Sequence, residues 1–123
     1  MTTVQADLSP TLHGIATCDT VKKARAWLDG RGAAYRFHDF RKLGVPEDEL
    51  RRWIAAVGWE RLVNRQGTTW RRLDEAARDG VVDAASAAAL MRDQPSVIRR
   101  PVLAVGGEVV VGFDAARYAA LFG

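Results

Sequence analysis

The chain contains a single cysteine, Cys18, and its surroundings are the most promising place for chemistry. A short apolar run at 12–15 precedes it, and residues 19–28 carry apolar side chains at helical spacing with basic side chains opposite. This pattern predicts a strand, a short turn and a helix whose first turn contains the thiol. Unpaired backbone N–H groups and a partial positive charge at a helix start favour a thiolate. Cys18 is therefore a candidate nucleophile, and a buried structural cysteine is the alternative.

A helix start alone does not make a thiol reactive. The helix dipole contributes about 0.3–1 kcal/mol, which is less than one pKa unit at about 1.36 kcal/mol per unit. Lowering a thiol pKa from about 8.5 to about 6 therefore needs a cationic partner as well. The neighbouring Asp19 opposes the shift because it is an anion. The rest of the chain must bring an arginine or a lysine to Cys18.

Composition excludes several classes of function. The chain is long enough for one domain with its own core, and its lone cysteine allows no intramolecular disulfide, so we expect a cytoplasmic protein. No apolar run approaches the roughly 20 residues that span a membrane. The 18 basic and 15 acidic residues are mostly interleaved, without a basic block that carries aromatics, so we expect no nucleic-acid partner. His13 and His38 lack companions at metal-ligand spacing, so we assign no metal.

The remaining elements are predicted from local patterns. Residues 35–40 alternate apolar and polar side chains, which predicts a half-buried strand with His38 exposed, whereas His13 in the first strand either joins the core or lines the pocket of the cysteine. Two β-branched runs flank Gly106 and Gly107, which is typical of a hairpin. Helices are predicted at 46–57, 59–63, 70–78, 83–91 and 114–122, with a polar loop at 64–69.

The order of these elements predicts the fold. It reads β-α-β, then helices, then β-β-α, which we interpret as a thioredoxin-like α/β fold with a mixed four-stranded sheet and an inserted all-helical subdomain. We expect a loose leader at 1–10 and a single domain at 11–123 with the helical insertion at about 44–96. When the two halves of the sheet meet, Pro101 at the start of the third strand lies beside the turn before Cys18. A cis peptide at Pro101 is expected there, and it would hold Arg100 close to the thiol.

Three stretches carry a family resemblance. GIATCDTVKKARAWL at 14–28, LVNRQGTTWRRL at 62–73 and PSVIRRPVL at 95–103 resemble the arsenate reductase/Spx family, which consists of thioredoxin-like proteins with a helical insertion. The resemblance covers about residues 11–122, and its most specific element is the Pro-x-x-Ile-x-Arg-Pro segment at 95–101. The CDTVKKA and GTTWRRL stretches are most similar to a subgroup regarded as glutathione-dependent thiol reductases.

The resemblance implies roles for individual residues. In arsenate reductases of this type a cysteine attacks arsenate and three arginines hold the oxyanion. Cys18 takes the place of the cysteine and Arg100 that of one arginine, but the other two positions hold Asn64, with Arg65 adjacent, and Gly112. Because a tetrahedral oxyanion needs several directional donors, this sequence favours thiol chemistry over arsenate.

Three functions follow, in this order. The first is a glutathione-dependent monothiol oxidoreductase acting through a mixed disulfide. The second is a glutaredoxin- or glutathione-coupled arsenate reductase, and the third is a non-enzymatic, Spx-like regulator that binds RNA polymerase. Val21 stands where Spx proteins usually have a second cysteine, so no switch within the chain can form and an external thiol must resolve Cys18.

The glutathione-dependent function implies particular binding groups and partners. The groups are expected to be Arg100, Arg65, Asn64, the open N–H groups at Cys18 and Asp19, and the cis-Pro position Pro101. We expect no bound cofactor, with glutathione as the co-substrate. We also expect a monomer whose partners are glutathione or another small thiol and a glutaredoxin.

Overall fold

The structure is a computed structural model that describes residues 10–122, and the contacts within it divide the chain into two compact units. The first unit combines residues up to 38 with those from 100 onward, and the second comprises residues 39–99. The helical insertion expected at 44–96 lies inside the second unit. The expected leader lies outside the described residues apart from Pro10, whose carbonyl oxygen accepts the N–H of Arg36 at 2.9 Å.

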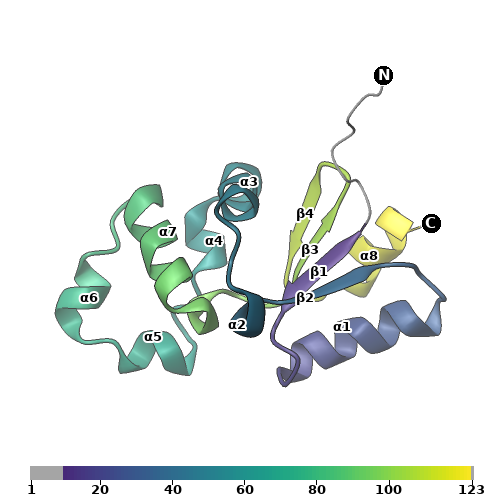
Figure 1. Ribbon diagram of the computed structural model, residues 1–123, viewed down its shortest axis with the longest axis horizontal. Helices are drawn as coiled ribbons and strands as arrows, with labels where there is room; N and C mark the ends of the chain where they lie inside the picture. Colours follow the sequence, from purple (N-terminus) through teal and green to yellow (C-terminus); the bar gives the residue numbers. More distant parts are fainter. Residues whose placement is uncertain (1–9, 123) are drawn as a thin grey trace. The chain divides into compact units, whose positions relative to one another are not determined.

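The first unit is built on a four-stranded sheet with strand order β2-β1-β3-β4 (Figure 1). Strand β3 pairs antiparallel with both β1 and β4. This arrangement confirms the predicted fold class, a thioredoxin-like mixed sheet with a helical insertion. The elements are β1 (Thr11–Gly14), α1 (Asp19–Gly30), β2 (Arg36–Asp39), β3 (Val102–Val105), β4 (Glu108–Val111) and α8 (Ala115–Phe122).

Helices α1 and α8 share one hydrophobic core with the sheet. The indole of Trp27 in α1 meets the ring of Tyr118 in α8 edge to face, with centroids 5.7 Å apart. Leu12 and Leu103, which are paired across β1 and β3, face this core. The helices therefore cover the same face of the sheet. The fully buried members of this cluster are Leu12, Ala24, Leu28, Leu103 and Tyr118.

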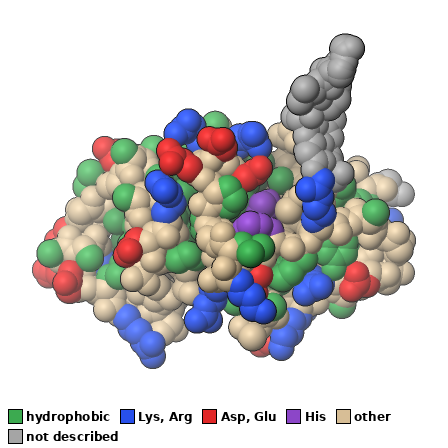
Figure 2. All heavy atoms as spheres, in the orientation of Figure 1, with side chains coloured by type: hydrophobic (Ala, Val, Ile, Leu, Met, Phe, Trp, Pro, Cys, Tyr) green, Lys and Arg blue, Asp and Glu red, His purple; other side chains and the backbone are tan. Residues whose placement is uncertain are grey.

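The second unit is mainly helical, and besides its helices it contains Asp39 at the end of β2 and an isolated β-bridge between Val63 and Ile98. The indole of Trp53 and the side chain of Met91 are fully buried in it. Figure 2 shows basic and acidic side chains interspersed on the visible face of the protein. The elements are α2 (Phe40–Leu43), α3 (Glu47–Val57), α4 (Trp59–Leu62), α5 (Thr68–Arg72), α6 (Glu75–Asp79), α7 (Ala84–Asp93) and the 3-10 helix η1 (Pro95–Val97).

The helix predicted at 70–78 is two helices, so that prediction is wrong. Helix α5 ends at Arg72, Leu73 is extended, and α6 begins after Asp74. The carboxylate of Asp74 accepts the N–H of Ala77 at 2.7 Å and so caps a new helix start. An aspartate inside a helical pattern therefore restarts the helix here instead of continuing it.

The prediction of an exposed His38 is also wrong. His38 is half-buried, and its ring centroid lies 5.3 Å from that of His13. Because β2 and β1 are neighbours, side chains on the same face of the two strands meet. His13 is 3 % exposed and belongs to the core. None of the helices formed by residues 10–122 has the length and apolar character needed to cross a membrane.

Candidate active site

Cys18 is the N-cap residue of α1, immediately before the first helical residue. Its extended backbone closes the turn after β1, because its N–H donates to the carbonyl oxygen of Ile15 at 3.0 Å. Its own carbonyl oxygen accepts the N–H of Lys22 at 2.9 Å, the first hydrogen bond of the helix. The thiol therefore lies at the start of the helix. The N–H of Cys18, which we expected to be open to a ligand, is used within this turn.

The surroundings of Cys18 lower the pKa of its thiol. Partial burial raises this pKa, but the backbone N–H groups of Val21 and Thr20 and the guanidinium of Arg100 together lower it further than burial raises it. The thiol makes no capping hydrogen bond, so we attribute the effect of the two N–H groups to their dipoles at the helix start. Arg100 acts both as a hydrogen-bond donor and as a positive charge. Cys18 is half-buried, so part of the residue is exposed to solvent.

The sheet register explains why Arg100 reaches Cys18. His13 in β1 is the partner of Val102 in β3, and the two strands run antiparallel. Continuing that register places the residues just before Val102 beside the turn that leads from β1 to the cysteine. The peptide bond between Arg100 and Pro101 is cis, as expected. The carbonyl oxygen of Pro101 accepts the N–H of Gly112 at 2.8 Å, which ties this segment to the end of β4.

The structure thus brings Cys18, Arg100 and Pro101 together within the first unit. Asp19 follows the cysteine as the first residue of α1, and binding of a substrate by its backbone N–H stays a prediction. The contributions of Thr20 and Val21 were missed from the sequence. The available signal was the rule that an N-cap side chain meets the N–H groups two and three residues later.

Asn64 and Arg65 lie in the second unit, where both have local contacts. The side-chain oxygen of Asn64 accepts the N–H of Gln66 at 3.1 Å, so this side chain is part of its own loop. The guanidinium of Arg65 lies over two indole rings, 5.6 Å from the centroid of Trp59 and 5.7 Å from that of Trp70. These cation–π contacts were not predicted, because they depend on how the helices pack.

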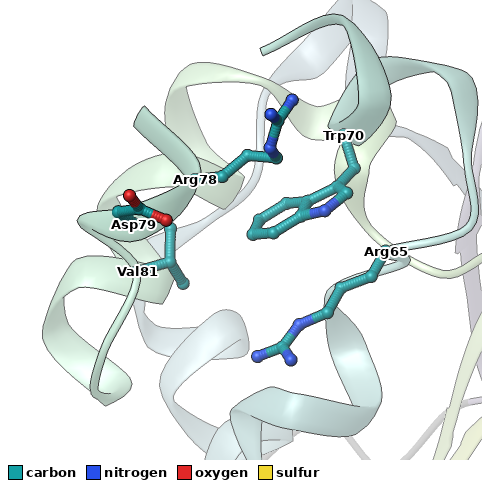
Figure 3. A pocket seen from close by; sticks show the side chains of 5 residues that line it. All are labelled: Arg65, Trp70, Arg78, Asp79 and Val81. Carbon is teal, nitrogen blue, oxygen red and sulfur yellow. The ribbon is translucent and has the colours of Figure 1, made fainter. Parts of the chain in front are cut away.

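Arg65 also lines a cavity of about 400 Å³ (Figure 3). The residues around this cavity all belong to the second unit. Elsewhere, no group of three His, Cys, Asp or Glu residues within 10–122 is arranged to hold a metal ion. The residues lining the cavity are Arg65, Trp70, Arg78, Asp79 and Val81.

Known proteins with similar sequences and folds extend over nearly the whole chain. An uncharacterized protein from Haemophilus influenzae is 37% identical, covering 91% of this chain and 97% of its own length. Among solved structures, the YFFB protein is 50% identical with a TM-score of 0.88, over 94% of this chain and 100% of its own. An arsenate reductase (ArsC) related protein from Brucella melitensis is 49% identical with a TM-score of 0.71, over 97% and 98% of the two chains.

The match to a family is equally extensive. Residues 13–121 match the ArsC family, a range that contains the cysteine turn, the helical unit and the Arg100–Pro101 segment. The chain therefore belongs to the ArsC family, which includes arsenate reductases.

Proposed function

We propose that this protein is a glutathione-dependent monothiol oxidoreductase with Cys18 as its nucleophile. The observation that carries the proposal is the position of the only thiol in the chain, at the start of α1 beside the Arg100 guanidinium. Both features favour the thiolate, which is the reactive form in thiol–disulfide exchange. With no second cysteine in the sequence, the oxidised intermediate must be resolved by an external thiol.

The reaction consists of two exchanges. The Cys18 thiolate attacks the glutathione sulfur of a mixed disulfide R–S–S–G, the S–S bond breaks, and R–S⁻ leaves while Cys18–S–S–G forms. The thiolate of a second glutathione then attacks the glutathione sulfur of that intermediate, releasing oxidised glutathione and the Cys18 thiolate. In total, R–S–S–G and one glutathione thiol give R–SH and oxidised glutathione, and the proton that the glutathione thiol loses balances the one that R–S⁻ takes up.

Arg100 serves both exchanges in this scheme. Before the first exchange its charge stabilises the Cys18 thiolate. Once Cys18 is in the mixed disulfide its charge is gone, so the guanidinium becomes available for a carboxylate of the bound glutathione. In the second exchange Arg100 again stabilises Cys18 as the leaving thiolate. The backbone N–H of Asp19, the first residue of α1, is a further proposed contact for the tripeptide.

The proposal is tested by mass spectrometry combined with turnover. The protein incubated with oxidised glutathione should gain one glutathione, at Cys18, and reduced glutathione should remove it. The same protein should catalyse reduction of a glutathione mixed disulfide by glutathione, and Cys18→Ser should abolish both the adduct and turnover. Absence of an adduct on the unmodified protein would overturn the proposal. An adduct that reduced glutathione cannot resolve would also overturn it, and would favour the regulator that binds a protein partner.

A further inference from the structure

A second binding site is suggested by the cavity beside Arg65, which is formed by residues of the helical unit alone. Three segments contribute its lining: the loop before α5 with Arg65, α5 itself with Trp70, and the end of α6 with the residues that follow it. Figure 3 shows the Arg65 and Asp79 side chains reaching the cavity from different sides, with the Trp70 indole beside them. A cavity of about 400 Å³ is large enough for a small molecule.

The contacts of Arg65 leave the N–H donors of its guanidinium available to bind a ligand. Its guanidinium is positioned by the indole faces of Trp59 and Trp70. Among the described residues it forms no ion pair and no side-chain hydrogen bond with the protein. A guanidinium that lies over aromatic rings keeps its planar set of N–H donors, which match a carboxylate in a bidentate manner. Arg65 is therefore prepared to receive a carboxylate.

The other two charged residues of the lining restrict the ligand further. Arg78 donates to the carbonyl oxygens of Leu73 and Arg71, so it adds positive charge while part of its donor set is used. The carboxylate of Asp79 is exposed and forms no ion pair within residues 10–122. Asp79 disfavours a ligand that is only anionic, and the two arginines disfavour one that is only cationic. A ligand that carries both a negative and a positive charge can pair with the arginines and with Asp79.

We propose that this cavity binds the zwitterionic head group of an α-amino acid, with its carboxylate on Arg65 and its ammonium on Asp79. The Trp70 ring provides an apolar surface for the carbon atoms of the ligand. Such a head group occurs in free amino acids and at the γ-glutamyl end of glutathione. Only the second source connects this site with the proposed function, and in that case the inference rests on it.

NMR titration with small molecules that do not react with Cys18 can test this site. The signal to follow is the indole N–H of Trp70, which the Trp70→Phe variant identifies by its loss. L-Glutamate should shift this signal with a dissociation constant on the order of millimolar, as expected for a few exposed polar contacts. Glutarate lacks the ammonium and 4-aminobutyrate lacks the α-carboxylate, so both should bind at least roughly fivefold more weakly. No shift with any probe, or glutarate binding as well as glutamate, would overturn the proposal.

Matched variants assign the two charges. Arg65→Gln should weaken glutamate binding roughly fivefold, whereas Arg72→Gln, an exposed arginine of the same region outside the lining, should not change it. Asp79→Asn should remove the preference for glutamate over glutarate. Equal losses in the two arginine variants, or an unchanged preference in Asp79→Asn, would contradict the assignment. Arg65→Lys, which keeps the charge, should retain part of the affinity, and its complete loss without unfolding would show that charge does not hold the ligand.

Two further probes identify the source of the head group. S-Methylglutathione carries the γ-glutamyl head group but cannot form a disulfide with Cys18, and S-methylcysteinylglycine lacks that head group. Binding of the first and not the second assigns the site to glutathione, and binding of glutamate alone assigns it to a free amino acid. Because no probe reacts with Cys18, failure here leaves the thiol chemistry standing. Failure of the thiol chemistry likewise leaves this site standing.

Discussion

Arg100 and Arg99 are adjacent in the chain but have different contacts. The Arg100 guanidinium acts on the Cys18 thiol, whereas the Nε of Arg99 donates to the carbonyl oxygen of Arg61 at 3.1 Å. Arg100→Ala should therefore raise the pKa of Cys18 and slow its reaction with oxidised glutathione at neutral pH, roughly three- to tenfold for the loss of one charge-assisted contact at a half-buried site. Arg99→Ala is the matched control and should leave both unchanged. Equal effects of the two substitutions would contradict the assignment of Arg100.

His13 gives the protein a pH-dependent stability. Burial, and to a smaller extent the neighbouring His38, lower the pKa of His13 from 6.5 to about 4. Between these values the unfolded chain binds a proton that the folded protein does not, so stability rises with pH in this window. The full contribution is present above about 6.5 and is lost as the pH falls towards about 4, by at most about 1.36 kcal/mol per pH unit.

Urea unfolding at several pH values measures this effect. The free energy of unfolding should decline as the pH is lowered from about 6.5, and His13→Gln should flatten that decline even if it lowers stability overall. His38→Gln removes only the smaller cause and should keep most of the slope. A slope that His13→Gln leaves unchanged would show that another group is responsible.

The end of β4 positions the segment that carries Arg100. Gly112 has a φ of +84°, a conformation that other residues adopt with strain, and its N–H holds the carbonyl oxygen of Pro101. Its own carbonyl oxygen accepts the hydroxyl of the buried Tyr118 at 3.4 Å. Gly112 is thus a positioning residue between the hairpin, α8 and the thiol site.

A pair of glycine substitutions separates positioning from general destabilisation. Gly106, in the turn of the same hairpin, also has a positive φ, and neither glycine has an atom within 4 Å of an added Cβ. Gly112→Ala and Gly106→Ala should both lower stability by about 1–2 kcal/mol. Only Gly112→Ala should also raise the pKa of Cys18, because only it disturbs the Pro101 contact. Similar Cys18 pKa values in both variants would rule out the positioning role.

Elements with strong local signals were predictable from the sequence. The strands at 102–105 and 108–111 and the turn at Gly106 and Gly107 are found as predicted, because β-branched runs around two glycines leave few alternatives. Asp83, where the helix at 83–91 was predicted to begin, is the cap residue of α7, and its capping box with Ser86 is an addition that the structure reveals. The break at Asp74 was missed, since a cap residue inside a helical pattern has no local signature that distinguishes it from a surface aspartate.

The candidate site was likewise predictable only in part. The cysteine turn and the segment before Pro101 could be predicted because strand order and register bring them together. The surroundings of Arg65 could not, because Trp59 and Trp70 meet it only through the packing of short helices. The contact between His13 and His38 likewise depends on which strands are neighbours and on which face each side chain lies.

At the scale of the whole molecule, membership of the ArsC family raises the question of arsenate. The resemblance to arsenate reductases implies arginines at two positions that here hold Asn64 and Gly112. One charge-assisted hydrogen bond contributes about 1.5–3 kcal/mol, so each loss should weaken oxyanion stabilisation roughly ten- to a hundredfold. We therefore predict that arsenate reduction with glutathione is weak or absent.

Steady-state turnover with arsenate and glutathione, measured beside a dedicated arsenate reductase, tests this prediction. Asn64→Arg is the informative gain-of-function variant, although it also removes the bond from Asn64 to the N–H of Gln66. Gly112→Arg is less favourable, because an arginine at a φ of +84° is strained. Turnover by the unmodified protein as fast as by the dedicated enzyme would refute the argument from the missing arginines.

The ionisation of Cys18 decides the central claim most directly. The absorbance of the thiolate in the ultraviolet can be followed against pH in the unmodified protein, with Cys18→Ser subtracted as the blank. The start of α1 and the Arg100 guanidinium lower the thiol pKa, so we predict a midpoint clearly below the usual value of about 8.5. A midpoint at or above about 8.5 would contradict the account, because Cys18 would then be mostly protonated at neutral pH.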